Sequence, residues 1–508
     1  MPESLDGQDA APTDLPLATR VVRGGTVVAL TSYGLVLFGF LATLVLTRIL
    51  SPEDFGIVSL ATFFFSLLNL RPKLGVELAF GQRRDIGPQA SGTFALLNIA
   101  AGLGSLLLAL IAAPILLWFH YSPAVVSVLL VLGLVGVSDS IMGVAWVQLD
   151  KALLFGRVSL VMAAAFPLSY LPAFYMAVRG WGYWALVAST ATYSVLLLVG
   201  LWWSLKKALP ALFAERWALS GRLAREFIGF GSLIGIATIA ASLVYQFDNF
   251  LVGTFVGLAG LGFYERAYRI AQWPSLLVSS VLSRTAFYAY SQLQNDLVRL
   301  TKTATMSLWM ITSLALPLAL AIFVSADDLV SLLFGERWLP SALFVRFLVA
   351  YSVLRPLLDD ATSLFIAVGQ PRRTTLVTLA QAATIVAAAT PLTLAFGATG
   401  TAVGVGITFI VGLIVTYYFV RRTLPTLSLS QAFVVPAFAT VAGLAAYFAL
   451  SSVVDLGLLP LIARVVVKAA SAALVFAAVT LALRPRLTIE RAEYVWRLLR
   501  NSAANVPS

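Results

Sequence analysis

Long apolar segments separated by short polar connectors run through almost the whole sequence of 508 residues. Hydrophobic residues make up 60% of the chain and charged residues only 11%, too few to cover a water-soluble protein of this size. A helix needs ~20 apolar residues to cross a bilayer. We therefore expect an all-α integral membrane protein with fourteen transmembrane helices, at residues 24–48, 56–80, 92–118, 123–148, 157–178, 182–205, 226–253, 258–283, 302–323, 341–367, 373–396, 398–421, 429–450 and 461–483.

Arginine and lysine gather in alternate connectors, for example Arg83-Arg84 and Lys206-Lys207. The opposite set of connectors holds only Arg48, Arg179 and Arg337. Because positively charged loops stay in the cytoplasm, both termini are predicted to be cytoplasmic. The net charge of +11 is thus a topology signal, and we expect no nucleic-acid partner.

The chain has no cysteine and a single histidine, His120. Disulfides are therefore excluded, and a zinc site built by the protein is not expected. We predict no metal site, no catalytic residue and no bound cofactor.

Ionisable side chains inside apolar spans are costly, so they mark candidate functional positions. Arg71, Lys73 and Glu77 lie within one predicted span. On a continuous helix Lys73 and Glu77 share a face and can neutralise each other, whereas Arg71 has no acidic residue four positions away. Arg71 therefore needs an anion from elsewhere, unless Arg71 and Lys73 extend to the lipid headgroups instead.

The second half of the chain carries a similar set of charges within its spans. Arg266 has no acidic residue four positions away, whereas Glu265 can pair with Arg269, and Arg355 with Asp359. These pairs have a purely structural interpretation as an alternative. Arg346 and Arg464 lie near outer span ends, where they can reach headgroups. The solitary acids Asp139 and Asp248 serve either helix packing or ion coupling.

An internal repeat relates the two halves. Residues 51–61 align with residues 257–267 at an offset of 206, pairing Gly56 with Gly262 and Ala61 with Ala267. Both copies open a span, and six spans separate them, so the two halves have the same orientation. Parallel repeats of this kind are a transporter architecture with substrate held between the halves.

Two motifs resemble those of a known family. Thr47-Arg48-Ile49-Leu50-Ser51-Pro52-Glu53-Asp54-Phe55-Gly56 is similar to the segment after the first span of bacterial polysaccharide transporters. Asp248-Asn249-Phe250-Leu251-Val252-Gly253, followed by Gly262-Phe263-Tyr264-Glu265-Arg266-Ala267-Tyr268-Arg269, resembles the start of their second half. The chain thus resembles the Wzx-type flippases of the multidrug/oligosaccharidyl-lipid/polysaccharide superfamily, particularly the colanic acid and succinoglycan exporters, over roughly residues 20–485.

The resemblance implies two pseudo-symmetric six-helix bundles around a central cavity, with two additional C-terminal helices. The predicted regions are a disordered cytoplasmic tail (1–19), the first bundle (20–205), a cytoplasmic linker (206–225), the second bundle (226–421), two extra transmembrane helices (422–485) and an amphipathic cytoplasmic tail (486–508).

The implied function is alternating-access transport of undecaprenyl-pyrophosphate-linked oligosaccharide repeat units to the outer leaflet of the bacterial inner membrane. Implied partners are this lipid-linked glycan, membrane lipids, and a polysaccharide polymerase with its chain-length complex. Expected substrate-binding residues are Arg71, Lys73, Arg266, Arg269 and Arg355. Expected ion-coupling residues, for a proton or sodium gradient, are Glu77, Asp139 and Asp248.

Two other functions compete with this interpretation. A multidrug cation antiporter belongs to the same superfamily. A membrane-embedded polymerase or glycosyltransferase would need a catalytic loop outside the membrane. In the early part of the chain, Glu53-Asp54 is the only candidate for its acidic residues. These acids follow Ser51-Pro52, however, and an N-cap serine, a first-turn proline and acids at a helix start explain them better.

The predicted topology can be tested by cysteine labelling, because the natural chain has no cysteine. Single cysteines at Ser122 and Asp455 should react with a membrane-impermeant thiol reagent added outside the cell, whereas a cysteine at Ser220 should react only after permeabilisation. Labelling in the reverse pattern would overturn the predicted orientation.

Overall fold

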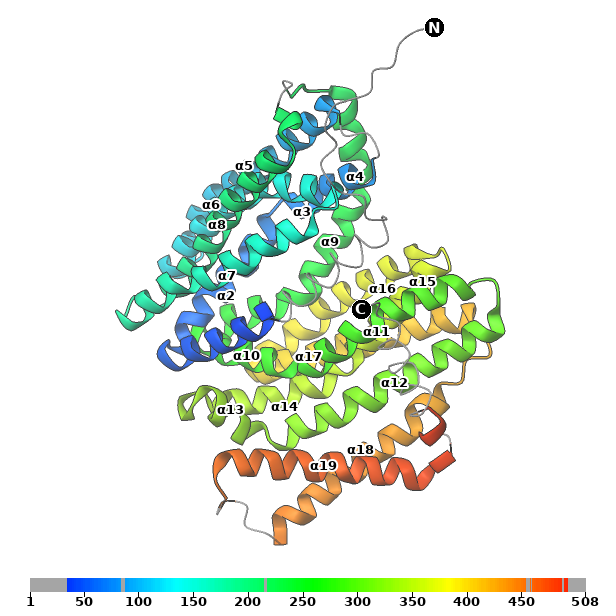
Figure 1. Ribbon diagram of the computed structural model, residues 1–508. Helices are drawn as coiled ribbons and strands as arrows, with labels where there is room; N and C mark the ends of the chain where they lie inside the picture. Colours follow the sequence, from blue (N-terminus) through cyan, green and yellow to red (C-terminus); the bar gives the residue numbers. More distant parts are fainter. Residues whose placement is uncertain are drawn as a thin grey trace. The chain divides into compact units, whose positions relative to one another are not determined.

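The computed structural model describes residues 34–83, 87–213, 217–453, 457, 459–486 and 488–491, and the regular elements in these ranges are all helices (Figure 1). The predicted tail at 1–19 lies outside the described residues, as does most of the predicted segment at 486–508. The chain forms two compact units, Met1–Ile49 with Leu68–Gly235 and Leu50–Leu67 with Ile236–Ser508.

The first unit is built around four long helices, with α6 packed against both α5 and α8, and α7 against α8 (Figure 1). Its core includes Phe80 and Phe94, whose rings stack in parallel with centroids 4.3 Å apart. Its helices are Gly34–Ile49, α3 (Arg71–Leu74), α4 (Val76–Gln82), α5 (Pro88–Trp118), α6 (Pro123–Lys151), α7 (Phe155–Val178), α8 (Trp184–Ala208), the short 3-10 helix η1 (Pro210–Phe213) and the first part of α9 (Gly221–Phe255).

The second unit holds the rest of α9, α2 (Pro52–Leu68) and the helices that follow α9. Within it α12 packs against both α18 and α19, α11 against α15, and α10 against α14. These later elements are α10 (Leu258–Ala271), α11 (Trp273–Leu293), α12 (Leu297–Val324), α13 (Ala326–Phe334), η2 (Glu336–Trp338), α14 (Pro340–Ser352), α15 (Leu354–Ala367), α16 (Pro371–Thr384), η3 (Ile385–Ala389), α17 (Thr390–Thr423), α18 (Leu429–Val453) and α19 (Leu461–Leu483).

The predicted helix-start signals are confirmed. The backbone N–H of Asp54 donates to Ser51 Oγ at 3.2 Å, and the backbone N–H of Ser51 donates to Asp54 Oδ2 at 2.8 Å. Ser122 Oγ likewise accepts from the backbone N–H of Ala124 at 3.3 Å. These caps satisfy backbone donors at the starts of α2 and α6, so Asp54 has a structural role.

Eleven helical segments among the described residues are long and apolar enough to cross a membrane. The predicted spans at 373–396 and 398–421 form one helical segment of 53 residues, Pro371–Thr423, with a non-helical break at Gly397 (φ 61°, ψ −144°). The predicted span at 258–283 is divided between α10 and α11. The described part of the first predicted span is the shorter apolar helix Gly34–Ile49. The count of fourteen therefore stays a prediction.

The two repeat motifs contact each other directly within the second unit. A Cβ atom on Gly56 of α2 would overlap the carbonyl oxygen of Leu258, and one on Gly262 of α10 would overlap the carbonyl oxygen of Pro52. Leu258 follows Pro52 by 206 residues and Gly262 follows Gly56 by the same number. The reciprocal contact supports the alignment predicted from sequence, and only glycine lets the two backbones approach this closely.

We predict that Gly56→Ala and Gly262→Ala each lower the melting temperature of the purified protein, because overpacking a close helix contact costs about 1–3 kcal/mol. Gly81→Ala is the matched control, since a Cβ on Gly81 in α4 meets no atom within 4 Å. Differential scanning fluorimetry in detergent measures all three variants. Unchanged melting temperatures for both crossing-glycine variants would contradict this packing.

A network of ion pairs connects α13 to α14 and α19. The buried carboxylate of Asp328 accepts from Lys468 Nζ at 2.5 Å and pairs with Arg464 at 3.3 Å, while Asp327 pairs with Arg346. Arg346 and Arg464 thus have protein carboxylates as partners, and their expected extension to the headgroups stays a prediction. Their partners on α13 lie too far along the chain for local spacing to identify them.

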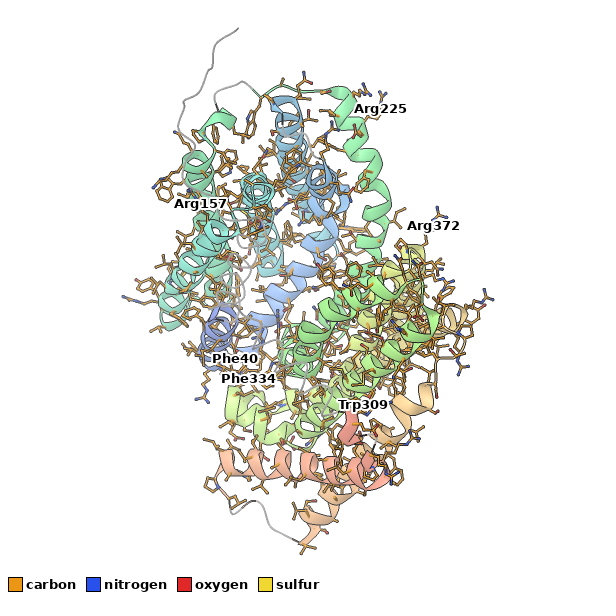
Figure 2. All side chains as sticks on the ribbon, turned by 45° about the vertical axis from the view of Figure 1, so that its right-hand side comes forward. Phe40, Arg157, Arg225, Trp309, Phe334 and Arg372 are labelled. Carbon is orange, nitrogen blue, oxygen red and sulfur yellow. The ribbon has the colours of Figure 1, made fainter. Side chains whose placement is uncertain are left out.

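Basic side chains at several helix starts extend away from the backbone. Arg157 in the first turn of α7, Arg225 near the start of α9 and Arg372 in the first turn of α16 are exposed (Figure 2). All three belong to connectors for which the sequence predicts a cytoplasmic position. That orientation stays a prediction.

Candidate functional site

The charged segment of the second predicted span is not a continuous helix. Helix α2 ends at Leu68, α3 spans only Arg71–Leu74, and α4 begins at Val76. Gly75 between them has φ 59° and ψ 14°, a left-handed conformation that glycine adopts without a steric penalty. The prediction that Lys73 and Glu77 share one face of an unbroken helix is therefore wrong.

The break brings Glu77 to Arg71. Arg71 Nε and Nη2 both lie 2.7 Å from Glu77 Oε1, and the side chains are 21% and 31% exposed. The prediction that the local sequence offers Arg71 no partner is thus also wrong. The reason is geometric, because six residues separate the pair and the left-handed turn at Gly75 replaces the helical spacing on which the prediction rested.

Two neighbouring helices shape the space around this pair. Asn98 Nδ2 on α5 donates to the Ser140 carbonyl oxygen at 2.8 Å and approaches Glu77 Oε1 at 3.4 Å. On α6, a Cβ atom at Gly143 would lie 2.5 Å from Arg71 Nη2 and 2.8 Å from Glu77 Oε1. Glycine at position 143 therefore makes room for the ion pair.

A second acid of the predicted set, Asp139, belongs to the same cluster. Its Oδ1 accepts from Ser194 Oγ of α8 at 2.5 Å, and its charge interacts with that of Arg71. The structure thus brings together Arg71, Glu77 and Asp139, with Lys73 buried on the same short helix α3. The sequence suggested that Asp139 is isolated from basic charge, but in the structure it interacts with Arg71.

Sequence reasoning missed Asn98, Gly143 and Ser194 as members of this cluster. An amide inside the apolar stretch 92–118 was a usable signal for Asn98. Gly143 and Ser194 carried no such signal, because small residues occur throughout the spans.

In the second unit, one carboxylate is shared by two arginines of α10. Glu265 Oε1 accepts from Arg269 Nε at 2.8 Å, which confirms the predicted pair, and Glu265 Oε2 accepts from Arg266 Nε at 2.6 Å. The prediction that Arg266 lacks an acidic partner is wrong, because its neighbour in sequence supplies one.

The two arginines differ sharply in accessibility. Only 7% of the Arg266 side chain is exposed, and the Phe55 ring covers its guanidinium with 4.2 Å between Cζ and the ring centroid. The Arg269 side chain is 67% exposed. Arg269 therefore lies at the surface of its unit, whereas Arg266 is enclosed by protein.

The remaining predicted residues of the second unit lie near its buried polar groups. Asp248 Oδ2 accepts from the Tyr264 hydroxyl at 3.1 Å, and among the described residues Asp248 forms no ion pair. The predicted Arg355–Asp359 ion pair is absent from the described contacts. The Arg355 guanidinium instead lies 4.7 Å from the Tyr245 ring centroid, and Asp359 Oδ2 accepts from Ser279 Oγ at 2.9 Å.

Arg355 also lines a cavity of about 20 Å³ in the second unit. Its polar lining includes Tyr268, Gln272, Ser275, Tyr351 and Ser352. This volume holds about one water molecule, so the cavity is too small for a phosphorylated glycan.

Asp360 is another buried acid that the prediction of site residues omitted. Its Oδ1 accepts from Ser307 Oγ at 2.6 Å and from the Tyr290 hydroxyl at 3.0 Å. Within the part of the chain that the structure describes, no three acidic or histidine side chains come together in a way that could hold a metal ion.

The helical arrangement resembles that of solved membrane transporters. A solved lipid II flippase, MurJ in an inward closed conformation, matches 91% of this chain and 100% of its own with a TM-score of 0.71 at 11% identity. An inward-facing multidrug resistance transporter of the MATE family, in the MOP superfamily, matches 77% of this chain and 95% of its own with a TM-score of 0.62 at 16% identity. The fold is therefore shared with transporters of this superfamily.

Residues 45–343 match the family model described as polysaccharide biosynthesis protein, and the chain belongs to this family. TuaB, a teichuronic acid biosynthesis protein of Bacillus subtilis (strain 168), is 26% identical over 58% of this chain and 61% of its own length. ExoT, a succinoglycan biosynthesis transport protein of Rhizobium meliloti (strain 1021), is 27% identical over 59% of each chain. The chain thus spans about three fifths of these relatives, and the resemblance predicted from its two motifs is confirmed.

Proposed function

We propose that this protein is a flippase for polyprenyl-pyrophosphate-linked oligosaccharides, moving them from the inner to the outer leaflet of the bacterial cytoplasmic membrane. The observation that carries the proposal is the Arg71 cluster, a basic group partly accessible inside a predicted span of a polysaccharide biosynthesis family member. The lipid carrier of the substrate would be undecaprenyl pyrophosphate. The protein would cross the membrane fourteen times, with both termini in the cytoplasm.

Arg71 in the first unit and Arg269 in the second are, each within its own unit, the arginines best suited to bind a phosphate group. Both guanidiniums are at least partly exposed, and arginine offers paired donors that match phosphate oxygens. Lys73 and Arg355 would supply further positive charge. The enclosure of Arg266 favours a structural role for it, in which it holds Glu265 and packs on Phe55.

Transport of this kind requires no covalent chemistry by the protein. The glycan would move through a hydrated route by alternating access while the polyprenyl chain stays in lipid. The outward-facing product would then pass to a polysaccharide polymerase and its chain-length complex. The names of the relatives, which include a transport protein, support transport over enzymatic activity.

Export of polysaccharide in a complementation strain tests the proposed function. Arg71→Ala and Arg269→Ala should abolish export at normal membrane levels of protein, and Arg71→Lys should reduce it because lysine loses the planar paired geometry. Arg83→Ala is the matched control, since Arg83 forms a different ion pair, with 2.8 Å between its Nη1 and Glu226 Oε1. Normal export by both alanine variants would exclude anion binding at Arg71 and at Arg269.

Ion coupling would involve Asp139 and Asp248, with Glu77 as a third carboxylate. Asp139→Asn and Asp248→Asn preserve shape but remove the charge, so each should change how transport in vesicles depends on an imposed proton or sodium gradient. If both variants retain the wild-type gradient dependence, these acids serve helix packing through Ser194 and Tyr264 instead.

Multidrug cation export is the second candidate, favoured by the similarity to the MATE transporter fold. Gradient-driven uptake of a cationic dye by vesicles containing the purified protein would support it. Dye uptake without export of polysaccharide would replace the flippase proposal.

A further inference from the structure

The guanidinium edge that would bind a phosphate is already occupied. Arg71 directs both Nε and Nη2 to a single carboxylate oxygen, Glu77 Oε1, at 2.7 Å. This edge is the one that arginine uses for paired hydrogen bonds to carboxylates and phosphates. An incoming anion therefore meets a site that already holds an anionic group of the protein.

We propose that Glu77 is a displaceable counter-ion that occupies the Arg71 site in the substrate-free protein and must leave when the substrate pyrophosphate binds. This inference rests on the proposed function. It assigns Glu77 a positioning role in substrate selection, distinct from contact with the substrate.

The surroundings of the pair allow such an exchange. Glu77 is 31% exposed and Arg71 21%, so neither group is sealed inside the first unit. Asn98 is fixed by its 2.8 Å hydrogen bond to the Ser140 carbonyl oxygen, whereas its approach to Glu77 is long, at 3.4 Å. Asn98 therefore orients the carboxylate without holding it tightly.

The packing confines the exchange to the site itself. Gly143 leaves no room for even a Cβ atom beside Arg71 Nη2 and Glu77 Oε1, so the guanidinium cannot swing away toward α6. Asp139 accepts a hydrogen bond from Ser194 Oγ at 2.5 Å, so it already has a partner on α8. Departure of Glu77 is thus the simplest way to free the guanidinium edge.

The exchange would also select the substrate by charge. A pyrophosphate diester carries two negative charges on adjacent groups, whereas the Glu77 carboxylate carries one. The diester can therefore offer the Arg71 guanidinium more negative charge than the carboxylate does. A singly charged phosphate diester competes less well with Glu77. Its one negative charge only replaces the interaction that the Glu77 carboxylate already made with Arg71.

Binding of inorganic pyrophosphate and of a singly charged phosphate diester, dimethyl phosphate, to the purified full-length protein, measured by isothermal titration calorimetry in detergent, tests the proposal. Glu77→Gln should bind pyrophosphate about tenfold more tightly than wild type, since one charged hydrogen-bond partner no longer has to be displaced. Its preference for pyrophosphate over dimethyl phosphate should fall. Arg71→Ala should bind neither.

Two further variants sharpen the comparison. Glu226→Gln also removes a carboxylate from an arginine pair, but on α9 and away from the site, so its affinity should equal that of wild type. Glu77→Asp shortens the side chain and weakens the pair while keeping the charge. It should give a smaller gain in affinity, and it replaces Glu77→Gln if that variant does not accumulate.

The outcomes separate this inference from the proposed function. Wild-type affinity or weaker binding in both Glu77 variants, with binding still lost in Arg71→Ala, would overturn the displacement of Glu77 and leave pyrophosphate recognition standing. Absence of pyrophosphate binding in wild type and in both Glu77 variants would count against the proposed function itself.

Discussion

An arginine inside an apolar helix keeps its charge, and the structure depends on where each such charge finds a partner. Each unit solves the problem locally. Arg71 obtains Glu77 because the helix breaks at Gly75, and Arg266 obtains Glu265 from the adjacent position on an unbroken helix. The first solution leaves an accessible pair at a backbone break, and the second encloses one guanidinium under an aromatic ring. The same chemical need therefore produces a candidate binding site in one unit and a largely structural element in the other.

Close backbone contact is the second constraint, and it connects the repeat to the fold. Gly56 and Gly262 occupy equivalent places in their motifs, and each lies against the backbone at the start of the other motif. Two nearly unrelated sequence segments therefore keep glycine where the crossing of α2 and α10 requires it. This explains why so little identity remains between the repeats, because the crossing imposes one small residue per copy and leaves the flanking apolar positions free to vary.

The sequence predicted the helical class, the family, the caps at Ser51 and Ser122, the repeat and the Glu265–Arg269 pair, because these depend on composition or on spacing along one helix. It failed wherever the backbone departs from regular geometry. The i,i+4 rule could not place Glu77 beside Arg71 across a left-handed glycine. It predicted that Arg355 and Asp359 interact, and their charges do, but their close contacts are with Tyr245 and Ser279. Pairs between distant helices, such as Asp328 with Lys468, were likewise beyond a single sequence.

Accessibility rather than charge separates the arginines that can bind a ligand under the proposed function from those that cannot. Glu265 divides its two oxygens between the enclosed Arg266 and the exposed Arg269, so one carboxylate anchors the helix while the outer guanidinium keeps donors for a ligand. Glu77 contributes a single oxygen to a pair that solvent can reach. A carboxylate bound to one partly exposed arginine can be exchanged at modest cost, whereas removing one shared with a buried arginine would leave a charge without a partner inside the protein. The exchangeable acid of this protein is therefore Glu77, and Glu265 is the fixed one.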